Sequence, residues 1–113
     1  MGALDKQSIY IAGPMTGYEN YNFAAFDAAK DWLFNVYGME SVISPADMDR
    51  ELGIEPDANG DIENFDYRAA IKRCCLAVCE CDSIYMLAGW ENSKGARAEH
   101  AIAVCLDLGI IYE

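Results

Sequence analysis

Four short apolar runs alternate along the chain with longer segments of mixed polarity. The runs are SIYIAG (8–13), SVIS (41–44), DSIYMLAG (82–89) and GIIYE (109–113). Each is rich in β-branched or aromatic residues, and a short apolar run of this composition is typical of a strand. We therefore predict four strands.

Three segments between these runs have apolar residues every three or four positions, which is the spacing of a helix face. They cover residues 22–37, 64–81 and 93–108, and Gly38 follows the first as a stop signal. Residues 45–63 are acidic and contain Gly53, Pro56 and Gly60. That composition predicts a long loop holding one helical turn.

The alternation of strands and helices predicts a parallel sheet with helices on both faces. The 113 residues fit one domain, 1–113, with a single core. We therefore expect a small Rossmann-like (flavodoxin-like) α/β sandwich with about four parallel strands. Ligands of such sheets bind at the carboxyl ends of the strands, where the loops 13–22, 44–64 and 88–94 should meet.

Composition and charge limit the partners of the chain. The hydrophobic content of 53% is enough to fill a core, whereas the net charge of -11 argues against duplex nucleic acid or an anionic membrane. The charge does not exclude a small anionic ligand held by local amides and hydroxyls. Residues 1–7 do not resemble a signal peptide, and no apolar run approaches the roughly 18 residues of a membrane span. We expect a cytoplasmic protein.

The five cysteines are an odd number without a secretory signal, so we expect reduced thiols. There is no CxxC pair, and His100 is the only histidine. Packing of helices by small thiols is therefore favoured over a metal site. The cysteines are Cys74, Cys75, Cys79, Cys81 and Cys105.

The segment AGWENSKGARAEHAIA (88–103) leads from a predicted strand into a predicted helix. Ser93 is a natural N-cap, and the first amides of a helix are free to bind phosphate or another anion. Gly95 lies one turn before Glu99 on the same helix face, so a ligand could approach Glu99 over it. The amides expected to be free belong to Lys94, Gly95 and Ala96.

Glu99 is the candidate catalytic group of this helix. An ionised, rigidly held glutamate can act as a nucleophile toward an anomeric carbon, and a helix N-terminus favours the ionised form. The alternative is a solvent-facing acid that pairs with Lys94 or Arg97.

Two segments together resemble a known superfamily. IYIAGPMTG and CDSIYMLAGWENSKGARAEHAIA are similar to the nucleoside 2-deoxyribosyltransferase superfamily, and more narrowly to small phage and bacterial domains with YIAGPMTG and GWxxSxGAxxE motifs. The resemblance covers the chain from Ile9 to the last strand. It implies a Rossmann-like fold, a homodimer or higher homo-oligomer whose subunits complete each other's pockets, and a host-cytoplasmic location for a phage protein. It also implies cleavage of an N-glycosidic bond by Glu99, for which no metal or organic cofactor is required.

The resemblance assigns further residues to a nucleotide site. In the branch that hydrolyses 2'-deoxynucleoside 5'-monophosphates, a serine six positions before the glutamate holds the phosphate, and here it is Ser93. The tyrosine of the first motif is Tyr10, which could instead be an ordinary core aromatic. Gly13 and Gly17 would shape the loop near the sugar and base.

Three aromatic or apolar residues have two interpretations each. Met15 and Tyr18 could flank the base or cover the edge of the sheet. Trp90 could stack on the base or cap the core.

The chain differs from the superfamily it resembles at one position, where an acid is replaced. Relatives commonly have an aspartate eight residues before the aspartate that opens the third strand, and Cys74 stands there, eight before Asp82. The missing acid would orient the sugar and help to protonate or position the leaving base. A neutral thiol does neither well, and Asp66 and Glu63 lie more than two turns away. Two functions follow: an N-glycosidase or deoxyribosyl-transferring enzyme, or a module that binds or sequesters a nucleotide without turnover.

Overall fold

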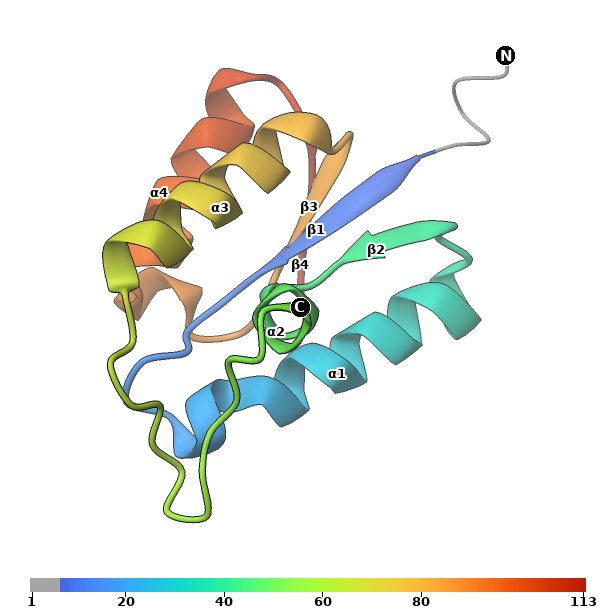
Figure 1. Ribbon diagram of the computed structural model, residues 1–113. Helices are drawn as coiled ribbons and strands as arrows, with labels where there is room; N and C mark the ends of the chain where they lie inside the picture. Colours follow the sequence, from blue (N-terminus) through green and yellow to red (C-terminus); the bar gives the residue numbers. More distant parts are fainter. Residues whose placement is uncertain (1–6) are drawn as a thin grey trace.

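A computed structural model describes residues 7–113 of the chain. The expectation that no signal peptide is present concerns a segment that lies almost wholly outside this part. Strands β1 (Ser8–Ala12), β2 (Ser41–Ile43), β3 (Ser83–Met86) and β4 (Gly109–Tyr112) form one sheet in the order β2-β1-β3-β4 (Figure 1). All three strand pairs are parallel, which confirms the predicted four-stranded parallel sheet.

Helices cover both faces of the sheet, as predicted. Helix α1 (Phe23–Trp32) lies on one face and continues into a π-helical turn (Leu33–Tyr37) that ends at Gly38. Helices α3 (Tyr67–Glu80) and α4 (Lys94–Cys105) lie side by side on the other face (Figure 1). Within residues 7–113, no helix combines the length and the apolar character needed to cross a bilayer.

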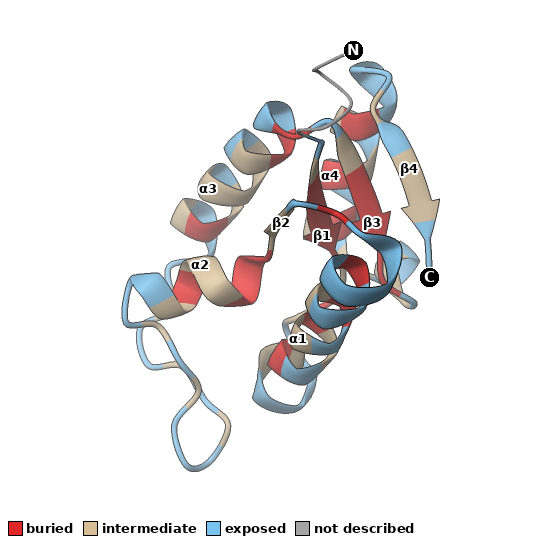
Figure 2. Cartoon of the chain, turned by 90° about the vertical axis from the view of Figure 1, so that its right-hand side faces the viewer, coloured by how far each residue is buried: buried red, intermediate tan, exposed pale blue. Residues whose placement is uncertain are grey.

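Strand β1 lies inside the sheet and is buried over most of its length (Figure 2). Its side chains alternate between two cores. Ile9 and Ile11 pack in the core beneath α1, whereas Tyr10 and Ala12 pack in the core beneath α3 and α4. This alternation follows from the two-residue period of a strand. It places the Tyr10 side chain on the face that α4 covers.

The acidic segment after β2 contains more structure than the sequence predicted. Helix α2 (Pro45–Glu51) spans seven residues, and Pro45 occupies its first turn, where a missing amide hydrogen costs nothing. The Arg50 guanidinium on α2 donates to Asp27 on α1, with Nη2 2.7 Å from Oδ2. A helix this short depends on such tertiary contacts, which explains why sequence periodicity indicated a loop.

Candidate active site

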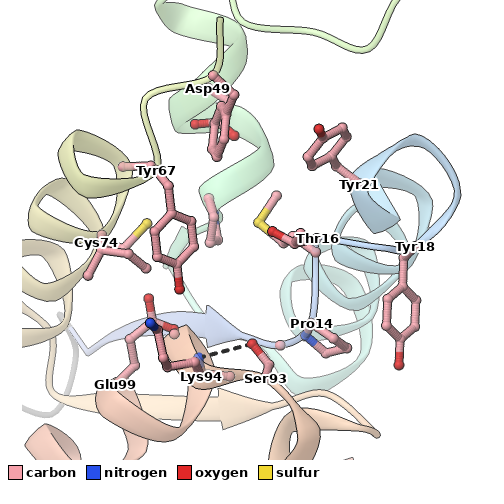
Figure 3. Close-up of a pocket in the computed structure, with 18 of the residues that line it drawn as sticks. Pro14, Thr16, Tyr18, Tyr21, Asp49, Tyr67, Cys74, Ser93, Lys94 and Glu99 are labelled. Carbon is pink, nitrogen blue, oxygen red and sulfur yellow. Dashed lines mark hydrogen bonds between the residues drawn. The ribbon is translucent and has the colours of Figure 1, made fainter. Parts of the chain in front are cut away.

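A cavity of about 510 Å³ lies at the carboxyl edge of the sheet. The loop after β1, helix α2 and the first halves of α3 and α4 line it (Figure 3). Each of the three loops expected to meet at this edge contributes residues to the wall. The volume is in the range of small-molecule sites, which is generally 300–1,000 Å³.

Glu99 lies in the second turn of α4, and its carboxyl group lines the cavity. The residue is 5% exposed, which excludes the alternative of a solvent-facing acid. Tyr10 donates a hydrogen bond from Oη to Glu99 Oε2 over 3.0 Å. Tyr10 of strand β1 thus orients the carboxyl group of Glu99, which lies 89 positions later in the chain.

The carboxyl group of Glu99 does not have the ionisation state that the helix start led us to expect. Burial raises the pKa of Glu99 to about 8, and the hydrogen bond from Tyr10 opposes this only in part. At pH 7, roughly one Glu99 carboxyl group in ten is ionised. Desolvation thus favours the protonated form of Glu99 and exceeds the effect of the helix dipole, which fades after the first turn.

Tyr10 serves both as a core aromatic and as part of the site. It is fully buried, so its interpretation as a core residue is correct. Burial, followed by the charge of Glu99 and by Cys74, raises the pKa of Tyr10 well above its ordinary value. Its hydroxyl therefore stays protonated and remains a hydrogen-bond donor.

Cys74 on α3 lines the cavity next to this pair. Burial, followed by the charge of Glu99, raises the pKa of Cys74 to about 12. The group is therefore a neutral thiol at the position where the resemblance implies an acid. All five cysteines are free, and residues 7–113 contain no group of three or more potential metal ligands.

The start of α4 offers fewer free donors than expected. Ser93 is the N-cap, and its Oγ accepts a hydrogen bond from the amide of Ala96 over 3.2 Å, which Figure 3 marks as a dashed line. The Ala96 amide is therefore occupied, and those of Lys94 and Gly95 are left to bind a ligand. The Ser93 hydroxyl hydrogen is not used by this bond and can also be donated.

Two glycines of the cavity wall pack closely against neighbouring side chains. A Cβ atom at Gly13 would lie 2.7 Å from the side chain of Leu87, and one at Gly95 would lie 2.9 Å from Cδ1 of Ile71. Gly95 thus brings the start of α4 against α3 as well as exposing its amide. Gly17 is not part of the wall; its φ of +88° serves the turn of the loop.

Met15, Tyr18 and Trp90 could each contact the base or cover the core or the sheet edge, and the structure places them differently. Met15 and Tyr18 line the cavity. Trp90 does not; it packs against the core beneath α3 and α4, and its ring stacks on His100 with centroids 4.3 Å apart. The core-capping interpretation of Trp90 is therefore favoured.

Asp49 on α2 is a cavity residue that the sequence analysis missed. It is 5% exposed, and the Arg73 guanidinium on α3 donates to it with Nη2 3.5 Å from Oδ1. Burial raises the pKa of Asp49, and Arg73 lowers it in part. A proline directly after a predicted strand could have suggested a helix at this edge.

Aromatic side chains form the remaining part of the wall that sequence analysis did not identify. Tyr21 and Phe65 form a tilted pair with centroids 5.8 Å apart, and both line the cavity. The Lys94 ammonium lies 5.9 Å from the centroid of the Tyr67 ring. These aromatics come from loops and helix starts, where no periodic pattern identifies them.

The fold and the cavity define a class: a small Rossmann-like α/β domain with buried carboxyl groups at the carboxyl edge of its parallel sheet. Residues 7–112 match a family described as a domain of unknown function (DUF4406), and the chain belongs to that family. No curated protein shows significant similarity to the chain.

Proposed function

We propose that the protein cleaves the N-glycosidic bond of a small (deoxy)nucleoside 5'-monophosphate, or transfers its sugar, with Glu99 as the nucleophile. One observation carries the proposal: the buried carboxyl group of Glu99, held by Tyr10 at 3.0 Å, faces a cavity of about 510 Å³ that the capped start of the same helix also lines. The motif resemblance supplies the reaction class.

The phosphate would bind at the start of α4. Ser93 and the amides of Lys94 and Gly95 are the donors, the Lys94 side chain adds a positive charge, and the helix dipole favours an anion there. Six residues along the helix, at roughly 1.5 Å each, separate Ser93 from Glu99 by roughly 9 Å. A sugar phosphate with one contact at each end bridges that span.

In the reaction, Glu99 attacks C1' of the sugar. A carboxylate oxygen forms a bond to C1' while the bond from C1' to the base nitrogen breaks, and its electron pair leaves with the base. Water or a second base then attacks C1' and releases Glu99. Tyr10 donates to Oε2 and so leaves the other carboxylate oxygen available for attack.

A non-catalytic nucleotide-binding module is the second candidate, and the neutral Cys74 thiol favours it. Incubation with deoxynucleoside 5'-monophosphates, followed by chromatography of the free base, distinguishes the two. Base release by the wild type that falls at least about a thousandfold in Glu99→Gln supports the enzyme. Binding without base release supports the module, and the absence of both contradicts both.

A homo-oligomer is part of the proposal. Leu76 on α3 and Val104 on α4 are exposed apolar side chains, and a second subunit would cover such positions. Sedimentation velocity of the wild type should give a mass of at least two chains, whereas a monomer at micromolar concentration would contradict this part.

A further inference from the structure

The proposed reaction needs a proton donor for the leaving base, because an anionic base is a poor leaving group. Cys74 is a neutral thiol with a pKa of about 12 and is a weak acid for this purpose. The acids weighed from the sequence, Asp66 and Glu63, are both exposed and do not belong to the cavity wall. Besides Glu99, Asp49 on α2 is the carboxyl group that lines the cavity wall.

Asp49 reaches the cavity from α2, across from Glu99, with Cys74 and Tyr67 on the wall between them (Figure 3). Arg73, the neighbour of Cys74 in α3, donates to Asp49 Oδ1 at 3.5 Å. A carboxyl group from α2 is therefore anchored beside the α3 position at which the resemblance implies an acid.

We infer that Asp49 is a second catalytic carboxyl group, which protonates the leaving base from α2 in place of an acid at Cys74. The inference rests on the proposed function and extends it to a residue that the motifs do not mark. Arg73 is the positioning residue of this pair.

The proton balance closes over the two steps. The protonated Asp49 carboxyl group gives its proton to the base as the electron pair of the breaking C1'–N bond moves onto the base, while the Glu99 carboxylate bonds to C1'. Water then attacks C1', its proton passes to the Asp49 carboxylate, and the electrons of the ester bond return to Glu99. One nucleotide and one water give one free base and one sugar 5'-phosphate.

The buried position of Asp49 favours its role as the proton donor to the leaving base. Desolvation raises the pKa of Asp49, so it keeps its proton to a higher pH than an exposed aspartate. Arg73 moderates this and stabilises the carboxylate that remains after proton transfer. The other charged groups of the wall are Glu99 and Lys94.

The test compares Asp49→Asn with two leaving groups. One substrate is a deoxynucleoside 5'-monophosphate, and the other is 4-nitrophenyl 2-deoxyribose 5-phosphate, whose leaving group needs no protonation. Asp49→Asn should lower base release by about 10²- to 10⁴-fold and nitrophenol release by less than about tenfold. Glu99→Gln should abolish both, and Glu51→Gln, an exposed acid on the same helix, should change neither.

A rescue variant separates chemistry from folding. Cys74→Asp in the Asp49→Asn background should restore base release at least about tenfold, because it returns a carboxyl group to the same region. Unchanged base release in Asp49→Asn, or equal losses with both substrates and no rescue, would overturn the inference while leaving the glycosidase in place. If the wild type turns over neither substrate, the proposed function itself fails, and the role of Asp49 falls with it.

Discussion

Replacement of Glu99 by glutamine should stabilise the protein in a pH-dependent manner. The buried carboxyl group has a pKa of about 8 in the folded protein, against an ordinary value of 4.5. Between these values the folded chain holds a proton that the unfolded chain releases. The free energy of unfolding therefore falls as pH rises through this window, and the fall is complete above pH 8.

The size of the effect follows from the two pKa values. Proton linkage lowers the free energy of unfolding of the wild type by about 1 kcal/mol at pH 5 and by about 3 kcal/mol at pH 7, relative to a chain whose residue 99 cannot ionise. Glu99→Gln has no proton to lose, and its side-chain oxygen can still accept from Tyr10. Its free energy of unfolding relative to wild type should therefore increase by about 2 kcal/mol from pH 5 to pH 7.

Urea denaturation followed by tryptophan fluorescence at pH 5, 6 and 7 measures this difference. The amide itself adds an offset that does not change with pH, so the slope is the quantity of interest. Glu63→Gln, which removes an exposed carboxylate, is the matched control and should show no such slope. A constant offset between Glu99→Gln and wild type would refute the buried position of the acid, and with it the proposed nucleophile.

Three further predictions concern the same site. Nitrophenol release by the wild type from 4-nitrophenyl 2-deoxyribose 5-phosphate, which needs no acid, should rise in kcat/KM about tenfold per pH unit from pH 6 and level off near 8, because only ionised Glu99 attacks; a flat profile would contradict this assignment. Ser93→Ala should lower the free energy of unfolding by about 1 kcal/mol through loss of the cap to Ala96. It should also weaken binding of a nucleotide, but not of the matching nucleoside, in calorimetric titrations; equal losses for both would argue against a phosphate at this helix start. Gly13→Ala should cost about 1–3 kcal/mol in urea denaturation, because its Cβ would lie 2.7 Å from Leu87, and an unchanged midpoint would show that Leu87 can move aside.

The fold was predictable because its signals are local. Four apolar runs define the strands, and three segments with apolar residues at helical spacing define the main helices. Parallel strands require helical crossovers on the faces of the sheet. The same local chemistry identified Ser93 as a helix cap and put Gly95 and Glu99 on one helix face. The carboxyl edge of the sheet then followed from the topology, and the cavity lies there.

The ionisation of Glu99 and the position of Asp49 were decided by the tertiary structure alone. Desolvation depends on every element that packs around a group, and the neighbours of Glu99 include a tyrosine 89 positions away. Asp49 enters the cavity because α2 is held against α1 by ion pairs between segments that carry no mutual signal in the sequence. Local spacing determines which residues share a face, whereas burial and charge proximity exist only after distant segments have packed together.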